Sequence, residues 1–307
     1  MLTGVRIWLI GSVVTLVALT APAGAAAARC QGHTATIVGT GARDTIVGTP
    51  GRDVIQALGG LDTIRSLDGD DVICGGDGAD VIHAGPGFLD EIQGGTGPDR
   101  IYGDRGTNNY ITGGKGRDLI YGGPGSDEVS AGPGRDEAFT GRGNDDALDW
   151  DSPGDDIYHL GPGTDFGRDG PGDDIFYGGP GRDYYDFAPS SVSGVDSFFG
   201  NAGRDTLWWR FSISPLLVDL TAGTAGEQGG ELDTVRSVQR VEGGGGDDTL
   251  IGDDRWNWLF GGGGNDHIEG RGGNDHLEVP EDLGFLDGGD GVDTCLGGET
   301  VLNCEAR

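Results

Sequence analysis

Basic residues are scarce in this sequence. Its 307 residues include 20 Lys and Arg but 51 Asp and Glu, which gives a formal net charge of −31. Binding to nucleic acid requires clusters of Lys and Arg against the phosphates, so this deficit excludes nucleic acid as a partner. A chain this acidic, with only 35% hydrophobic residues, cannot bury enough apolar surface to fold unless something neutralises its charge. Cations are therefore the predicted partners.

Long apolar runs are also rare. One lies near the N-terminus, where Arg6 precedes the apolar stretch 7–19 and the small residues 26–28 form an A-x-A cleavage site. This pattern is typical of a secretory signal peptide, so we predict that residues 1–28 are removed and that the mature protein is secreted and extracellular. The alternative is a membrane anchor, but the apolar stretch is short for a span and no stop-transfer segment follows. We predict no membrane span in the mature chain.

Motifs of common enzymes are absent. The sequence has no His-Glu-x-x-His, Gly-x-Ser-x-Gly or Walker motif. The stretch 149–160 begins like an EF-hand loop, but Pro153 stands at its fifth position and Leu160 at its twelfth, where a bidentate Glu belongs. A pair of Asp carboxylates could serve a polysaccharide-modifying enzyme, yet no two of them stand apart from the rest. We therefore predict a protein that is not an enzyme and has no catalytic residues.

Cysteine is limited to four residues, Cys30, Cys74, Cys295 and Cys304. An even number in a secreted chain favours disulfides. A zinc site is the alternative, and it is disfavoured because no paired Cys-x-x-Cys spacing occurs. We expect Cys30 to pair with Cys74 and Cys295 to pair with Cys304, so that each bond fastens one end of the mature chain.

Glycine, by contrast, is abundant at 65 residues. The stretch 75–83 reads Gly-Gly-Asp-Gly-Ala-Asp-Val-Ile-His, which follows the nonapeptide pattern Gly-Gly-x-Gly-x-Asp-x-apolar-x of calcium-binding β-helix repeats. Its first six residues predict a tight turn, because Gly adopts positive φ without a Cβ penalty, and its last three predict a short strand. One unit buries almost nothing, so it is stable only when stacked on copies of itself.

Copies of this unit occupy most of the chain. Its sixth position recurs in register at Asp44, Asp53, Asp62, Asp71, Asp80, Asp90, Asp99, Asp118, Asp127, Asp136, Asp145, Asp156, Asp165, Asp174, Asp183, Asp248, Asp266, Asp275 and Asp293, and Asn109, Asn257 and Gly284 stand at the same position of three further units. The eighth position predicts an aliphatic ladder inside a coil, formed by Ile46, Ile55, Ile64, Ile73, Ile82, Ile92, Ile101, Ile111, Ile120 and Val129.

The period divides the mature chain into three parts. N-terminal repeats occupy 29–186, an irregular aromatic-rich β segment occupies 187–242, and C-terminal repeats with a disulfide cap occupy 243–307. The ladder changes to small and aromatic residues between about 136 and 170, so we expect these coils to be the least well packed. The middle segment is expected to continue the same sheet irregularly. The alternative is an aromatic ligand-binding face containing Trp208, Trp209 and Phe211.

These repeats resemble the haemolysin-type calcium-binding repeats of the RTX proteins. The resemblance implies an all-β fold, a right-handed parallel β-roll (β-solenoid) with an irregular β insert, in which two units make one coil. It also implies that several Ca²⁺ ions lie between stacked turns, bound by the sixth-position Asp carboxylates and by backbone carbonyls. One row of sites would use Asp44, Asp62, Asp80, Asp99, Asp118, Asp136, Asp156 and Asp174; the other would use Asp53, Asp71, Asp90, Asn109, Asp127, Asp145, Asp165 and Asp183.

The chemistry of the repeat agrees with that resemblance. Calcium takes six to eight oxygen ligands, and carboxylates with backbone carbonyls in a flexible turn supply them. The main hypothesis is therefore a secreted calcium-binding protein whose folding is coupled to the ion. A second hypothesis is a calcium-stiffened adhesin that binds cell-surface or extracellular polysaccharide through the aromatic segment. We expect weak or absent sites at Asn109, Asn257 and Gly284, where the acid is missing.

Overall fold

The computed structural model describes residues 28–149, 152–187, 194–209, 211–280 and 283–305. The expected signal peptide, 1–28, lies outside the described residues except for Ala28. Among the residues that the structure describes, no helix is long and apolar enough to cross a membrane.

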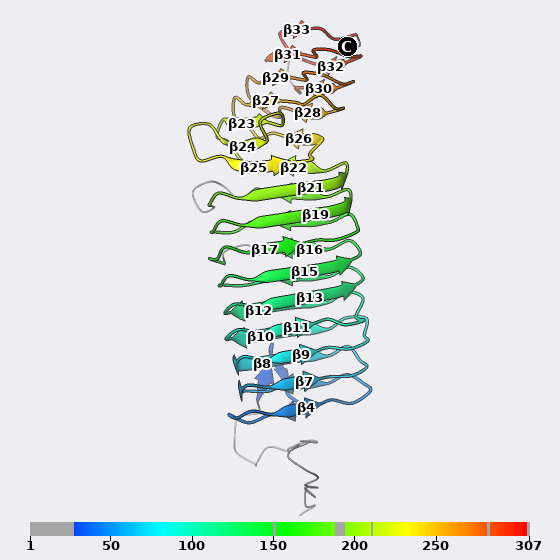
Figure 1. The fold of residues 1–307 in the computed structure, drawn as a ribbon, viewed down its shortest axis with the longest axis vertical. Coiled ribbons are helices and arrows are strands. Elements are labelled where there is room, and N and C mark those ends of the chain that lie inside the picture. The colour runs from blue at the N-terminus through cyan, green and yellow to red at the C-terminus, as the bar shows by residue number, and fades with distance from the viewer. Residues whose placement is uncertain (1–27, 150–151, 188–193, 210, 281–282, 306–307) are drawn as a thin grey trace, which may run out of the picture.

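The described chain winds into a parallel β-solenoid with two long sheets facing each other (Figure 1). We call the two sheets sheet 1 and sheet 2. Sheet 1 contains β3 (Ile37–Val38), β5 (Val54–Gln56), β6 (Gly59–Gly60), β8 (Val72–Gly78), β10 (Glu91–Thr96), β12 (Tyr110–Lys115), β14 (Glu128–Ser130), β16 (Asp146–Leu148), β18 (Phe166–Arg168), β20 (Tyr184–Asp186), β22 (Thr206–Trp208), β26 (Arg240–Glu242), β28 (Trp258–Phe260), β30 (His276–Glu278) and β32 (Thr294–Leu296).

Sheet 2 faces sheet 1 across the core. It contains β4 (Thr45–Val47), β7 (Thr63–Arg65), β9 (Val81–His83), β11 (Arg100–Tyr102), β13 (Leu119–Pro124), β15 (Glu137–Arg142), β17 (Ile157–His159), β19 (Ile175–Gly181), β21 (Ser197–Gly203), β23 (Leu216–Asp219), β24 (Thr224–Glu227), β25 (Asp233–Arg236), β27 (Thr249–Ile251), β29 (His267–Glu269), β31 (Phe285–Asp287) and β33 (Thr300–Leu302). A short antiparallel pair, β1 (Arg29–Cys30) and β2 (His33–Thr34), precedes both sheets.

Successive repeats lie in alternate sheets, so one coil takes two repeats. In sheet 1, Ile92 of β10 is in register with Ile73 of β8 and with Ile111 of β12. In sheet 2, Ile101 of β11 is in register with Ile82 and Ile120 in the same way. The parallel pairing and this register confirm the predicted all-β parallel roll.

The eighth-position side chains form the core. All ten residues of the predicted ladder, from Ile46 to Val129, are at most 2% exposed. Each fully buried aliphatic side chain of this size stabilises the fold by about 1.5–3 kcal/mol. Because one unit supplies only one such side chain, the stability of the roll depends on stacking many coils.

The loose packing expected between 136 and 170 is not found. Ala138 and Ala147 are fully buried. The large ring of Tyr158, which is in register with Ala138, extends until its hydroxyl lies 3.3 Å from the backbone N of Ala131. The ring of Tyr158 stacks on that of Phe176 at 4.6 Å between centroids. The lack of a side chain at Gly167 leaves room for the ring of Phe176, since a Cβ on Gly167 would lie 2.8 Å from Cδ1 of Phe176. The expectation treated each position separately, whereas large and small residues on adjacent coils compensate for each other.

Both sheets run through the aromatic segment 187–242. Strand β21 pairs with β19 and with β25, and β22 pairs with β20 and with β26. The irregularity is a local insertion, in which β24 pairs antiparallel with both β23 and β25 (Figure 1, yellow-green). The solenoid then resumes, because β23 pairs parallel with β27.

The structure does not place Trp208, Trp209 and Phe211 on one binding face. Trp209 is 5% exposed and stacks inside the roll on Phe187, with 4.6 Å between ring centroids. Trp208 is half-buried and packs near Phe166 and Tyr184, whereas Phe211 is 79% exposed. The hypothesis of a shared aromatic face is therefore wrong for Trp209. This residue follows β22 directly, and the inward–outward alternation of successive side chains places it inside the roll.

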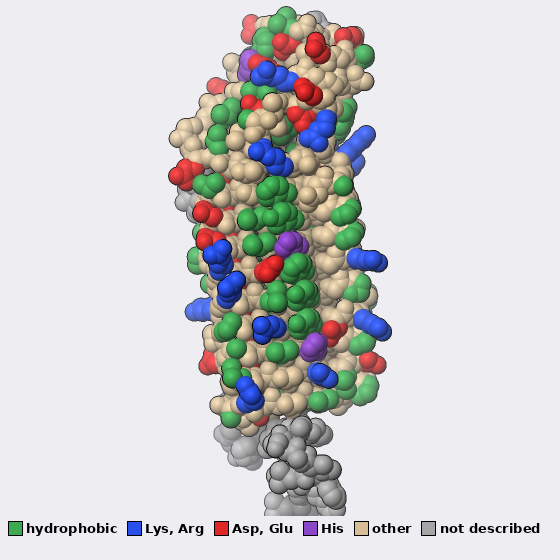
Figure 2. All heavy atoms as spheres, in the orientation of Figure 1, with side chains coloured by type: hydrophobic (Ala, Val, Ile, Leu, Met, Phe, Trp, Pro, Cys, Tyr) green, Lys and Arg blue, Asp and Glu red, His purple; other side chains and the backbone are tan. Residues whose placement is uncertain are grey.

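A continuous column of rings does line the outer face of sheet 2. Consecutive ring centroids in this column lie 4.4–5.2 Å apart with nearly parallel planes, along His83, Tyr102, Tyr121, Phe139, His159, Tyr177 and Phe199. Figure 2 shows a column of hydrophobic side chains and histidines along this face. These are the ninth positions of successive coils, and their stacking adds stability beyond the area that the rings bury.

Two disulfides fasten the ends of the described solenoid. Cys30 in β1 is bonded to Cys74 in β8, and Cys295 in β32 is bonded to Cys304. These pairings match those expected from the sequence. The first bond ties the β1–β2 pair to sheet 1, and the second closes the last coil.

Candidate metal sites

The glycine-rich turns stack backbone against backbone. Gly76 and Gly78 both have positive φ, at 105° and 142°, a region that other residues rarely enter. A Cβ on Gly78 would overlap the carbonyl oxygen of Gly60, one coil earlier. Glycine is therefore needed here both for the shape of the turn and for the close approach of carbonyl groups between coils.

The sixth-position carboxylates use one oxygen to join these turns. The backbone N–H of Asp80 donates to Oδ1 of Asp99 one coil later, at 2.8 Å, and Asp99 donates to Oδ1 of Asp118 at 2.8 Å. The same bond repeats through the row from Asp44 to Asp174, and in the other row between Asp53, Asp71 and Asp90 and from Asn109 to Asp183. The structure thus brings the predicted residues of each row into one line of turns.

The second carboxylate oxygen, Oδ2, is buried and has no hydrogen-bond partner in most of these residues. Among the described residues this holds for Asp62, Asp71, Asp80, Asp90, Asp99, Asp118, Asp127, Asp136, Asp156, Asp165, Asp174, Asp183, Asp196, Asp205, Asp266, Asp275 and Asp293. A buried polar atom without a partner is costly. A regular row of such atoms indicates that a proton or a cation completes them.

Backbone oxygens lie beside these carboxylates. A Cβ built on Gly75 would lie 2.7 Å from Oδ2 of Asp80 and 2.5 Å from the carbonyl oxygen of Gly94. The same two kinds of oxygen surround Gly94, where Asp99 and Gly113 supply them. Carboxylate and carbonyl oxygens gathered in a flexible turn are the donors that calcium prefers, so the residues present fit this ion.

Burial raises the pKa of these carboxyl groups. It raises the pKa of Asp99 to about 7; the N–H of Asp80 acts in the opposite direction, and the charges of Asp118 and Asp80 add to the increase. Burial likewise raises the pKa of Asp136 to about 8, with the charges of Asp156 and Asp118 adding to it. The rows therefore favour a neutralised state, which either protons or bound cations can provide.

Four sixth-position acids differ because a neighbouring group donates to Oδ2. Thr40 donates to Asp44 through its backbone N–H, and Thr49 donates to Asp53 in the same way, both at 2.6 Å. The hydroxyl of Thr140 is 3.0 Å from Oδ2 of Asp145, and the N–H of Gly244 donates to Asp248 at 3.1 Å. These carboxylates have less need of a cation than the others.

Two of the three lengthened turns keep their place in the hydrogen-bonded rows. Asp90 and Asp156 follow lengthened turns, yet they accept from Asp71 at 2.9 Å and from Asp136 at 2.6 Å. Asn109 donates to Asp127 at 2.7 Å, but its own Oδ1 is buried without a hydrogen-bond partner. The hydrogen-bonded row is therefore interrupted between Asp90 and Asn109.

The structure extends both rows beyond the residues predicted from the sequence. Asp174 donates to Asp196, and Asp196 donates to Asp233 across 37 residues, at 2.8 and 2.9 Å. Asp183 donates to Asp205, which donates to Oε1 of Gln239. The nine-residue spacing of Asp196 and Asp205 was a usable signal, whereas the β23–β24 insertion hides Asp233 and nothing in the sequence pattern singles out Gln239.

Comparison with protein-family models agrees with this geometry. A family model described as the RTX calcium-binding nonapeptide repeat (4 copies) matches residues 38–73, 57–88, 89–109, 105–138, 112–147, 159–188, 191–208 and 242–277. No curated protein matches the chain. A solved structure is similar at 18% identity and a TM-score of 0.32, over 89% of this chain and 82% of the other; it is described as a hyperactive, Ca²⁺-dependent, β-helical antifreeze protein from an Antarctic bacterium. The family model covers more than half of the sequence, and the chain therefore belongs to the family of RTX calcium-binding nonapeptide repeat proteins.

Proposed function

We propose that this chain is a secreted calcium-binding protein that folds when it binds the ion. The observation that carries this proposal is the double row of buried Oδ2 atoms without hydrogen-bond partners. Unfolded, these carboxylates are hydrated and spread apart; folded, they lie one coil apart in buried turns. Binding to the folded state alone stabilises it by mass action, so calcium would shift the equilibrium toward the solenoid.

The residues that would hold calcium are the sixth-position acids together with the carbonyls of the glycine turns. The ion would supply positive charge to compensate the carboxylates. The Oδ1 atoms already accept backbone N–H groups and so fix the orientation of each carboxylate, which leaves Oδ2 buried and without a hydrogen-bond partner. Magnesium fits less well, because it requires a tighter octahedral geometry and releases its water reluctantly.

Secretion is supported by the disulfides. Cys30–Cys74 and Cys295–Cys304 use all four cysteines, and such bonds persist in oxidising compartments. Extracellular fluids also supply calcium at roughly millimolar concentration, in the range of weak extracellular sites. N-terminal sequencing of the exported protein should find a start near Arg29; an uncleaved N-terminus would argue against export by a signal peptide.

The test of calcium-coupled folding is far-UV circular dichroism of the mature protein. Metal-free protein at neutral pH should lack most of the strand signal, and calcium should restore it. The same concentration of magnesium serves as the control and should restore little. An identical strand signal in calcium and in chelator would refute the coupling, although a calcium titration could still detect binding.

A further inference from the structure

The first position of each repeat points into the roll. It is usually glycine, and a Cβ there would meet Oδ2 of the sixth-position acid in the same unit, as at Gly75 beside Asp80. Where a side chain is present at this position it is buried, as for Ala131, Thr140 and Leu160. A residue at this position therefore contacts the metal row from the inside of the solenoid.

Asp149 occupies this inward position directly after β16. Its side chain is fully buried, with 0% exposure. Neither of its carboxylate oxygens accepts a hydrogen bond from an N–H or hydroxyl donor among the described residues, and its polar neighbour is the carboxyl group of Asp156. Asp149 does not belong to either sixth-position row. Asp169 occupies the same inward position one coil later, where it is also fully buried and lies beside Asp196.

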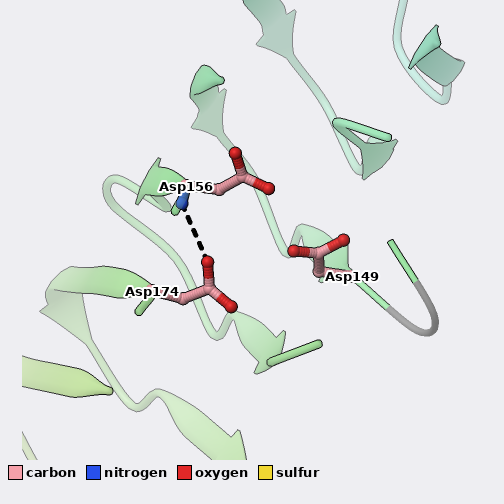
Figure 3. A group of neighbouring side chains, drawn as sticks. All are labelled: Asp149, Asp156 and Asp174. Carbon is pink, nitrogen blue, oxygen red and sulfur yellow. Dashed lines mark hydrogen bonds between the residues drawn. The ribbon is translucent and has the colours of Figure 1, made fainter. Parts of the chain in front are cut away.

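The carboxyl group of Asp149 is directed at two acids of the first row. Figure 3 shows it converging with the carboxyl groups of Asp156 and Asp174, which lie on successive coils. One oxygen from each of the three lies within 4.8 Å of the others, and all three residues are buried. Each of Asp156 and Asp174 uses Oδ1 for a backbone N–H and leaves Oδ2 without a partner.

These separations suit a single calcium ion. Calcium–oxygen distances of 2.3–2.6 Å place two ligands of one ion at most about 5 Å apart. We propose that Asp149, Asp156 and Asp174 form an interior calcium site with three carboxylates, and that this site binds calcium more tightly than the turns of this row that have glycine at the first position. The proposal rests on the proposed function, because it presupposes that the turns of this row bind calcium.

The higher affinity follows from charge. Calcium affinity in oxygen sites rises with the number of charged ligands, and an ordinary turn of this row offers the sixth-position acids of two coils. Asp149 adds a third negative charge from the interior, where water does not screen it. The first ion to bind would therefore sit in the middle of the array, where Ala138 and Ala147 replace larger aliphatic residues in the core.

The test is a calcium titration in competition with a chromophoric chelator, using the mature protein and Asp149→Gly. Glycine is the usual residue at this position of the repeat, so this variant restores an ordinary unit. Asp149→Asn keeps the volume of the side chain and removes its charge, so it distinguishes loss of the charge from a change in core packing. Ala131→Gly is the matched control, because Ala131 occupies the same position one coil earlier.

We expect one calcium ion that depends on Asp149, in the wild type and in Ala131→Gly, to resist a chelator concentration that removes the ions from turns with glycine at the first position. Its affinity should fall at least tenfold in both Asp149 variants, while the remaining ions bind as before. If the wild type shows no distinct tight ion, or if the Asp149 variants retain it, the proposal is wrong. If the wild type binds no calcium at all, the proposed function fails as well.

Discussion

The backbone N–H of Asp80 donates a 2.8 Å hydrogen bond to Oδ1 of Asp99, 19 residues later in the chain. A single carboxylate therefore has two separate tasks. Oδ1 joins one turn to the previous turn, and Oδ2 remains buried without a partner. An amide can perform the first task, since Asp205 donates to Oε1 of Gln239 at 2.8 Å, but an amide cannot supply the negative charge of the second.

Substitution of Asp99 should separate these tasks. Asp99→Asn keeps an acceptor for the N–H of Asp80, so it should weaken calcium binding at its turns with little loss of stability at saturating calcium. Asp99→Ala leaves that buried N–H without a partner and should cost a further ~1–3 kcal/mol. Urea unfolding at saturating calcium, together with a calcium titration, measures both effects. Equal stability of the two variants would show that the hydrogen bond is unimportant.

The metal-free protein should become more stable in acid. Burial raises the pKa of Asp99 to about 7 and the pKa values of Asp165 and Asp174 to about 8, against about 4 for Asp in an unfolded chain. The folded state thus binds more protons than the unfolded state between these values, so its stability decreases as pH rises from about 4 to 8. Circular dichroism without calcium should show strand signal near pH 5 that is lost above pH 7. A strand signal of the metal-free protein that is greatest at pH 8 would contradict the raised pKa values of these carboxyl groups.

A methyl group at Gly167 should destabilise the core. The Cβ of Gly167→Ala would lie 2.8 Å from Cδ1 of Phe176 and 3.1 Å from Cδ2 of Tyr185, and overpacking of this kind costs ~1–3 kcal/mol. Gly41→Ala is the control, because a Cβ there meets nothing within 4 Å. The free energy of unfolding at fixed calcium concentration compares the two. Equal values would mean that the rings move aside without cost.

Loss of the N-terminal disulfide should reduce stability more than loss of the C-terminal one. Cys30–Cys74 spans 44 residues and Cys295–Cys304 spans 9, and a longer loop loses more entropy in the unfolded chain when it is closed. The double variant Cys30→Ser with Cys74→Ser should lose about 2–4 kcal/mol. Thermal unfolding at saturating calcium measures the difference. A larger effect of Cys295→Ser with Cys304→Ser would show that native contacts at the last coil dominate over loop length.

The nine-residue period accounts for most of what could be predicted. It identifies the ladder from Ile46 to Val129 and the turn acids, because a solenoid repeats one local solution. It fails at Asp233, since the β23–β24 insertion lengthens the coil without breaking the row. It also conceals Asp149: glycine usually occupies that position, and a residue without a side chain gives no sign of facing inward. Trp209 stands at the same first position of its unit, so the sequence pattern did not show that its side chain faces inward.

The bonds between the turns also have a direction. Each sixth-position N–H donates to the next coil, and at the C-terminal end Asp293 donates to Oε2 of Glu305. The seventh-position N–H donates in the opposite direction, as that of Arg100 does to the carbonyl oxygen of Asp80 at 2.8 Å. Removing coils from either side would therefore leave backbone donors without acceptors. Both ends of the roll need a terminating group, and Glu305 supplies it after the last coil.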